Sequence, residues 1–383
     1  MTTSVGARVG DEVLLCPGPV VLSPAVRGAL TECQVGHRDE RYSALMRRLS
    51  RNCRPVFRSG DEHSILFIGG PATAAIEAVC ASLLPHDAHV IVPVNGTFGA
   101  RIAGILAVHG IAHTVVDFGF GQPFDLERLE RVIAGAGARP ATVLATTHHE
   151  TSAGVLNPVA ALGGIARRHR LRYIVDATSS AGVEDLDVTR DGIDACITAS
   201  GKCLHAAPGV GLVCVRRDWL AQSASAPARS YSLDLRRFHA QFECNAQTPF
   251  TPPVPLIAAL DRAVEELEAS GGVPERRRTY ARRRNLLVAG LQRLGLSLLP
   301  LPDGAAAHSI LTVEVPACIA FNALYAGMKA SGYLIYACKP PLDDRYFQLA
   351  VMGELRDADL AGFLGALSVL LDESTARYRA ARA

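Results

Sequence analysis

Apolar and polar positions follow two alternating patterns between residues 65 and 215. Around Ile76, Val79 and Leu83, as in several later stretches, apolar residues recur at helical spacing. Between these stretches lie short apolar runs typical of buried strands, at residues 65–68, 90–94, 113–118, 142–147, 172–176, 195–199 and 211–215. Strands that alternate with helices predict an α/β fold with a mostly parallel central sheet and helices on both faces.

A proline-rich bend at residues 249–255 ends this pattern. The chain beyond it predicts a long helical region that is interrupted at Gly271 and Gly272. After this region we expect strands at 309–315, 334–337 and 347–351 and helices at about 319–330 and 357–372. A chain of 383 residues has room for one large domain and a smaller one. We expect an N-terminal arm at 1–20, a large domain at 21–255 and a small C-terminal α+β domain at 256–383.

Composition and charge favour a globular protein. Apolar residues make up 49% of the chain and charged residues 20%, and the formal net charge of +2 gives no reason to expect nucleic acid or an anionic membrane as a partner. The arginine runs at 276–278 and 282–284 are expected on the solvated face of a helix. The chain shows neither a signal-peptide run nor a stretch of about 18 apolar residues, so we expect a cytoplasmic protein.

The ten cysteines stand alone along the chain, and none forms a C-x-x-C pair. Several lie inside predicted strands or helices, where a reduced thiol packs as a small apolar side chain. Their spacing favours a reducing compartment and predicts neither a disulfide framework nor a structural zinc site. We therefore expect no bound metal.

Lys202 is the first candidate for chemistry. It follows the predicted buried strand 195–199 and stands among small and apolar residues. A lysine that loses its hydration holds the ammonium form less well, so the neutral amine becomes available as a nucleophile. A solvated loop lysine is the alternative, because the sequence alone does not show the environment of the side chain.

Asp176 ends the preceding predicted strand, 172–176. Ligands of open α/β sheets bind at the carboxyl edge of the strands. An aspartate at that edge and a lysine at the exit of the next strand suit pyridoxal phosphate (PLP). The lysine forms the Schiff base, and the carboxylate keeps the pyridine nitrogen protonated so that the ring accepts electrons. The alternative role for Asp176 is that of a helix N-cap.

Three loops after other strands add to this pattern. Residues 69–73, Gly-Gly-Pro-Ala-Thr, could hold an anion through backbone amides and the Thr73 hydroxyl, with an ordinary tight turn as the alternative. This loop matches neither G-x-G-x-x-G nor Walker A, which disfavours dinucleotide and ATP binding. Phe98 could cover a planar ring or pack in the core. His148 and His149 point to opposite faces of an extended chain, which favours a cofactor-lining loop over a metal site.

These segments, in this order, resemble the class V group of fold-type I PLP-dependent aminotransferases, above all the 2-aminoethylphosphonate–pyruvate transaminases. The resemblance runs from residue 14 to about residue 370, on the segments 14–19, 72–78, 95–101, 149–158, 175–180, 200–203 and 250–253. It implies the fold-type I architecture and a homodimer with shared active sites. It also implies transfer of an amino group from a small amine such as 2-aminoethylphosphonate, or from an amino acid, to a keto acid such as pyruvate.

The resemblance implies roles for single residues. Lys202 holds PLP, Asp176 pairs with the ring nitrogen, and Phe98 stacks on the ring. The other cofactor contacts fall on the phosphate loop (Pro71, Ala72 and Thr73), the ring-hydroxyl side (Thr151, Ser152 and Ser179) and the phosphate in the partner subunit (Thr251). A non-catalytic binding protein is disfavoured, because it has no chemical need for both Lys202 and Asp176.

Two positions depart from the family pattern. Pro71 and Ala72 stand where relatives commonly have serine and glycine, and proline removes one amide donor from the phosphate loop. Gln348 stands where the transaminases present an arginine that grips the substrate carboxylate. Arg345 points to the opposite face of the strand, and Lys339 is another candidate cation for the substrate. The alternative function is therefore a PLP-dependent lyase or decarboxylase that acts on a specialised amine or amino acid.

Overall fold

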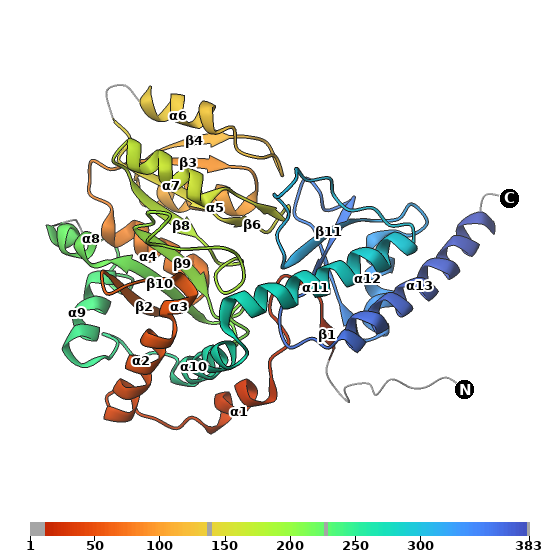
Figure 1. Ribbon diagram of the computed structural model, residues 1–383, viewed down its shortest axis with the longest axis horizontal. Helices are drawn as coiled ribbons and strands as arrows, with labels where there is room; N and C mark the ends of the chain where they lie inside the picture. The colour runs from red at the N-terminus through yellow and green to blue at the C-terminus, as the bar shows by residue number, and fades with distance from the viewer. Residues whose placement is uncertain (1–11, 136–139, 226–228, 381–383) are drawn as a thin grey trace.

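The centre of the protein is a seven-stranded sheet (Figure 1). The computed structural model describes residues 12–135, 140–225 and 229–380, so residues 1–11 of the expected arm and 381–383 of the expected small domain lie outside it. In spatial order the strands are β2 (His63–Gly69), β10 (Val210–Arg216), β9 (Ala195–Ala199), β8 (Arg172–Asp176), β5 (Val143–Thr147), β3 (His89–Val94) and β4 (Ala112–Asp117). Only β10 runs antiparallel to its neighbours, so the predicted mostly parallel sheet is confirmed.

Each face of this sheet has its own apolar core, because successive side chains of a strand point to opposite faces. On β2, for example, Phe67 belongs to one core and Leu66 to the other. The helices that cover the face of Leu66 are α4 (Ala72–Leu83), α5 (Thr97–Val108), α8 (Arg217–Gln222) and α9 (Leu235–Asn245). The face of Phe67 is covered by α2 (Glu40–Asn52), α6 (Leu126–Ala134), α7 (Val159–Arg168) and α10 (Val254–Ala269).

Six strands of the sheet share one direction, and their carboxyl ends therefore meet at one edge. These ends carry the segments that begin after Gly69, Val94, Thr147, Asp176 and Ala199. Every loop that the sequence marked as a candidate for chemistry leaves the sheet at this edge. This edge is also where ligands of open α/β sheets bind.

A second, smaller sheet lies in the C-terminal part of the chain. It joins β11 (Ile310–Glu314), β14 (Tyr346–Ala350) and β13 (Tyr336–Ala337) in antiparallel fashion. Its apolar core is completed by α11 (Gly272–Arg293), α12 (Phe321–Ala330) and α13 (Asp357–Ala380). The segment β1 (Val13–Leu14) pairs in parallel with β12 (Tyr333–Leu334), so the described start of the chain packs against this C-terminal part (Figure 1).

The packing of α10 bears on the expected domain boundary at residues 255 and 256. Ile257, Leu260 and Val264 of α10 share the core of the large sheet, whereas Tyr280 and Leu287 of α11 belong to the core of the small sheet. The packing therefore favours a boundary near the break between these two helices, one helix later than the sequence pattern suggested.

Some elements were not predicted. The helices α3 (Arg54–Phe57), α8 and α9 had no counterpart in the sequence pattern. The hairpin of β6 (His149–Glu150) and β7 (Val155–Leu156) was also missed, because strands of two residues give no periodic signal.

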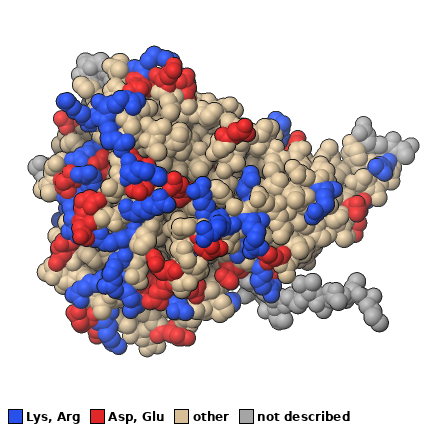
Figure 2. All heavy atoms as spheres, in the orientation of Figure 1, with Lys and Arg blue, Asp and Glu red and all other residues tan. Residues whose placement is uncertain are grey.

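No helix in the described part of the chain is long and apolar enough to cross a membrane. On the face shown in Figure 2, acidic side chains lie among basic ones. All ten cysteines are free, and the described residues contain no group of three His, Cys, Asp or Glu side chains that could hold a metal.

The arginine runs of α11 correct one expectation. Arg277, Arg278 and Arg282 are exposed, as predicted for a solvated face. Arg283, in contrast, is buried and donates hydrogen bonds to the backbone carbonyls of Val351, Gly353 and Leu355. A helical run of three arginines covers more than a single face, so one member points into the core and ties α11 to the chain that follows β14.

This network gives a first prediction. Arg283→Met should lower the free energy of unfolding by roughly 3 kcal/mol, because the substitution leaves three buried carbonyls without their donor. Arg277→Met is the matched control: Arg277 is exposed on the same helix, and its substitution should change stability by less than about 0.5 kcal/mol. Thermal unfolding of both variants, followed by circular dichroism, measures the difference. Equal midpoints for the two variants would contradict the structural role of Arg283.

Candidate active site

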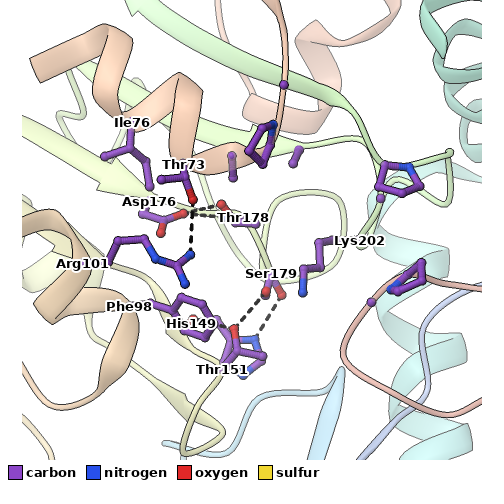
Figure 3. A pocket seen from close by; sticks show the side chains of 18 of the residues that line it. Thr73, Ile76, Phe98, Arg101, His149, Thr151, Asp176, Thr178, Ser179 and Lys202 are labelled. Carbon is purple, nitrogen blue, oxygen red and sulfur yellow. Dashed lines mark hydrogen bonds between the residues drawn. The ribbon is translucent and has the colours of Figure 1, made fainter. Parts of the chain in front are cut away.

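A cavity of about 500 Å³ opens at the carboxyl edge of the large sheet. We call it the inner cavity. It is lined by segments that follow β2, β3, β5, β8 and β9 and by the N-terminal segment around Gly18. Of the sequence-predicted site residues it brings together Lys202, Asp176, Phe98, Thr151, Ser179 and the phosphate-loop residues Pro71, Ala72 and Thr73 (Figure 3).

A second cavity, of about 580 Å³, adjoins the first at Gly18, Phe98, Thr151 and Lys202. We call it the outer cavity. The small C-terminal sheet and α12 supply most of its wall, which is largely aromatic or apolar at Phe321, Tyr325, Ile335, Tyr336 and Cys338. Lys202 therefore stands between a cavity built by the large sheet and one built mostly by the C-terminal part.

Lys202 lies in the turn that follows β9, and its amine is largely enclosed. The Nζ atom donates to the carbonyl of Pro17. Gly18 has a φ of +120°, and a Cβ atom at this position would lie 3.0 Å from the lysine Nζ, so the N-terminal segment approaches the amine as closely as only glycine allows. Burial lowers the pKa of Lys202, which makes the neutral, nucleophilic amine easier to form.

Asp176 ends β8 and is 5% exposed. Its Oδ1 accepts hydrogen bonds from Thr178 N at 3.0 Å and Thr178 Oγ1 at 2.5 Å, while Oδ2 has no partner among the described residues. Burial raises the pKa of Asp176, and the two bonds from Thr178 oppose that rise. A cationic group of a ligand next to Oδ2 would stabilise the carboxylate further.

The phosphate loop lies at the start of α4. Pro71 is the N-cap residue, and no side chain caps this end of the helix. The amides of Ala74 and Ala75 bond to the carbonyl of Pro71, whereas those of Ala72 and Thr73 have no acceptor among the described residues. Two free amides, the Thr73 hydroxyl and the positive end of a helix form a suitable place for an anion.

Glu150 fixes the helix that carries Phe98. It is fully buried, and its carboxylate accepts hydrogen bonds from Phe98 N at 3.1 Å and Gly99 N at 2.9 Å, at the start of α5. A Cβ atom at Gly96 would lie 2.5 Å from this carboxylate, so glycine is required for the approach. The side chain of Phe98 is thereby held at the wall of both cavities.

A second polar cluster lies opposite the phosphate loop (Figure 3). Thr151 Oγ1 donates to Ser179 Oγ at 2.9 Å. His149 Nδ1 lies 3.1 Å from the carbonyl oxygen of Ser179, so Nδ1 carries the proton, and Nε2 is buried without a partner among the described residues. Burial also lowers the pKa of His149, which favours the neutral ring. The cluster thus offers hydroxyls and a neutral imidazole.

Of the three residues that were expected to bind substrate, Gln348 and Lys339 line the outer cavity and Arg345 lies elsewhere. Gln348 is 5% exposed and lines the outer cavity, but its Nε2 donates to the carbonyl of Thr151 at 2.5 Å. Lys339 is exposed and lines the same cavity. Arg345 is exposed and lines a different depression, with Glu314 and Asp343. It precedes β14 and lies on the opposite side from Gln348, so its position does not support substrate binding.

The remaining cofactor candidates lie at the margins. Ser152 lines the outer cavity, and its Oγ atom donates to Glu150 and accepts from Thr97 N at 3.1 Å. Thr251 is exposed and lines neither cavity of its own chain. Its segment passes beside the phosphate loop, because a Cβ atom at Gly69 would lie 3.1 Å from the ring of Pro253.

Thr178 and Arg101, at the inner cavity, were not predicted as site residues, whereas His149 and Glu150 were expected only as members of a cofactor-lining loop without roles of their own. Thr178 follows Asp176 by two residues, the spacing at which an aspartate side chain bonds to its own backbone, and this signal was available in the sequence. Arg101 lies one helical turn after Phe98, and its guanidinium is 4.7 Å from the centre of the Phe98 ring. No local signal shows that this arginine faces the cavity, because that depends on how α5 packs.

The described residues fit PLP. A flat ring can lie against Phe98 with its nitrogen near Asp176 Oδ2, which lacks a partner. A phosphate can meet the free amides of α4, and an aldehyde can reach Lys202 from the same cavity. Among the described residues, Asp176 Oδ2 and the amides of Ala72 and Thr73 have no partners and could meet such a ligand.

Comparison with known proteins also supports PLP as the cofactor. The Aminotransferase class-V family model matches residues 26–323. The chain is 36% identical over 365 residues to a 2-aminoethylphosphonate–pyruvate transaminase of Burkholderia mallei, covering 94% of this chain and 97% of the relative. Among solved structures, the ureidoglycine–glyoxylate aminotransferase of Bacillus subtilis is 25% identical with a TM-score of 0.87, covering 95% of this chain and 94% of that one.

A further solved structure extends the likeness in fold. The pyridoxamine–pyruvate aminotransferase of Mesorhizobium loti has a TM-score of 0.87 at 21% identity, covering 97% of this chain and 94% of that one. The resemblance inferred from short motifs is thus confirmed over nearly the whole chain. The protein belongs to the class V aminotransferase family of PLP-dependent enzymes.

Proposed function

We propose that this enzyme transfers the amino group of a small primary amine with an acidic end, such as 2-aminoethylphosphonate, to a keto acid such as pyruvate. The observation that carries the proposal is the placement of Lys202 and Asp176 on one cavity, with an aromatic ring and a free helix end between them. The relatives named as 2-aminoethylphosphonate–pyruvate transaminases support the choice of both substrates. Family membership disfavours the alternative of a lyase or decarboxylase.

The positions of the side chains that line the inner cavity support the following proposed contacts with PLP. Lys202 attaches PLP, Asp176 holds its ring nitrogen in the protonated form, and Phe98 covers one face of the ring. The phosphate is held by the amides of Ala72 and Thr73 and by the Thr73 hydroxyl. Pro71 contributes no amide donor and acts only as the N-cap of α4. Thr151, supported by Ser179, faces the side of the ring hydroxyl.

PLP supplies an aldehyde that condenses with amines and a ring that accepts electrons from bonds at the substrate carbon. The protein supplies the proton transfer. Lys202 Nζ, which burial helps to keep neutral, would take the proton from the carbon that bears the amine and deliver it to the carbon contributed by the PLP aldehyde. The Pro17 carbonyl and Gly18 hold this amine at the junction of the two cavities.

The acidic end of the substrate lies in the outer cavity. Lys339 is the only charged side chain there besides Lys202 among the described lining residues, and it stands at the exposed rim. Donor and acceptor of a transaminase use the same site in turn, so Lys339 serves the phosphonate of one substrate and the carboxylate of the other. Gln348 acts indirectly: its Nε2 donates a hydrogen bond to the Thr151 carbonyl and so positions this part of the cavity wall.

Two further proposals concern assembly and location. Thr251 lines neither cavity of its own chain although its segment lies beside the phosphate loop, which suits a homodimer in which Thr251 reaches the phosphate of the partner subunit. The ten free cysteines, seven of them buried, suit the reducing interior of a cell, and we propose a cytoplasmic enzyme.

Covalent attachment of PLP is directly testable, because the chain has only three lysines: Lys202, Lys329 and Lys339. The purified protein should absorb visible light, and borohydride reduction should fix the cofactor to the peptide that contains Lys202. Lys202→Ala should show no adduct and lose activity by about 10²-fold or more. Lys329→Ala, an exposed change in the last turn of α12, is the control and should retain both. An adduct on Lys329 or Lys339 alone would reject the assignment.

The lowered pKa of Lys202 predicts how its reactivity depends on pH. A lower pKa keeps the amine neutral to lower pH, so Lys202 in the folded, PLP-free protein should be labelled by reductive methylation at lower pH than Lys202 in the urea-unfolded chain. Mass spectrometry of the Lys202 peptide across a pH series measures both midpoints. Coincident midpoints would show that the fold does not perturb this amine.

Substrate choice is tested by the production of alanine from 2-aminoethylphosphonate and pyruvate. Lys339→Gln should raise the KM for both substrates by about 5-fold, because each loses a partner for its anion at an exposed site. Lys339→Arg, which keeps the charge, should retain most of the affinity. The half-reaction with 3-aminopropan-1-ol, which has no acidic group, should be unchanged. No alanine from the wild-type enzyme would remove the proposed substrates, whereas an effect of Lys339→Gln on the amine without an acidic group would remove the proposed role of Lys339.

A further inference from the structure

Arg101 is a cation at the inner cavity that forms no ion pair with any described residue. It lies on α5, one turn after Phe98, and lines the cavity opposite Lys202 (Figure 3). None of the ion pairs among the described residues involves Arg101. Arg101 is exposed at the cavity, and its planar guanidinium is therefore available to a ligand with several oxygens.

The neighbours of Arg101 point to the kind of group that it would bind. Its Nη1 lies 3.4 Å from Thr73 Oγ1, in the first turn of α4. The amides of Ala72 and Thr73 beside this hydroxyl have no acceptor among the described residues, and the first turn of α4 contains no acidic side chain. Guanidinium, hydroxyl, two amides and the positive end of a helix thus meet at one place. Together they suit a dianion with several oxygens.

We propose that Arg101 binds the 5′-phosphate of PLP and makes the enzyme select the phosphorylated form of the cofactor. The inference rests on the proposed function, in which the phosphate lies at Ala72 and Thr73. Pro71 supplies no N–H to this site, and Arg101 provides the additional donor from a neighbouring helix. The guanidinium of Arg101 also lies over the Phe98 ring, so one side chain serves the phosphate and contacts the ring that covers the cofactor.

A purely structural role is the competing explanation. Arg101 could do no more than pack on Phe98, as Arg128 does on Phe118, where the guanidinium is 5.0 Å from the ring centre. Arg128 lines a different depression and not the inner cavity. The two arginines therefore make similar contacts with an aromatic ring, but only Arg101 adjoins the start of α4.

The affinities of the PLP-free protein for PLP and for pyridoxal separate these explanations, because pyridoxal lacks the phosphate. Arg101→Met should weaken PLP binding by about 10- to 100-fold and leave pyridoxal binding within about 2-fold, while Arg101→Lys should lie between Arg101→Met and the wild type for PLP. Inorganic phosphate should compete with PLP for the wild-type protein and lose this effect in Arg101→Met. The control Arg128→Met should bind both compounds as the wild type does. Absorption spectra in equilibrium dialysis report binding without any measurement of activity.

The outcomes distinguish this inference from the proposed function. Equal losses of PLP and pyridoxal affinity in Arg101→Met would mean that Arg101 only supports Phe98, and unchanged affinity for both would mean that it contributes nothing. Either result overturns the inference while PLP binding by the wild type stands. A wild-type protein that binds neither compound would overturn the proposed function itself.

Discussion

The parallel pairing of β8 with β9 is the constraint on which the site depends. Because Asp176 pairs with Ile197 in this register, the carboxylate lies at the edge where β9 ends and the Lys202 turn begins. Both groups are removed from water by the same fold, and burial disfavours the charged form of each. A ligand that brings a cationic nitrogen to the acid and an aldehyde to the amine relieves both costs. Two neighbouring strands therefore bring together an acid that suits the ring nitrogen of PLP and an amine that suits its aldehyde.

The C-terminal part contacts this site through the short hairpin at residues 149–156, in addition to the bond from Ser309 Oγ to the Ser179 carbonyl. Gln348 Nε2 bonds to the Thr151 carbonyl, Thr312 Oγ1 donates to the Ala153 carbonyl at 3.0 Å, and the amide of Leu156 donates to the carbonyl of Ala305 at 2.7 Å. The same hairpin holds Glu150, which caps α5. The small sheet thus positions the wall that carries Phe98 and Thr151, while its own side chains form the outer cavity where the substrate is proposed to lie.

Much of the fold could be predicted, because alternating strands and helices leave a strong periodic signal and parallel strands bring their loops to one edge. Lys202 and Asp176 were predictable for the same reason: each lies at or just after the carboxyl end of a strand. The packing of α10 on the large sheet, which the sequence does not show, favours a domain boundary one helix later than expected. Arg283 was misassigned because an arginine run does not reveal which member turns inward.

The substrate side of the site was harder to predict. Gln348 was chosen because it stands where the related transaminases have an arginine, but its bond to Thr151 depends on a hairpin whose two-residue strands leave no pattern. Arg101 and Thr73 are 28 residues apart, and their approach depends on how two helices pack against the sheet. Such contacts belong to tertiary structure, and short-range sequence patterns contain little information about them.

The most direct measurement of the central claim is a crystal structure of the protein with PLP. The account predicts density that is continuous from Lys202 Nζ to a ring packed on Phe98, with the ring nitrogen beside Asp176 and the phosphate at the start of α4. A ring bound elsewhere, or one whose nitrogen faces away from Asp176, would contradict it.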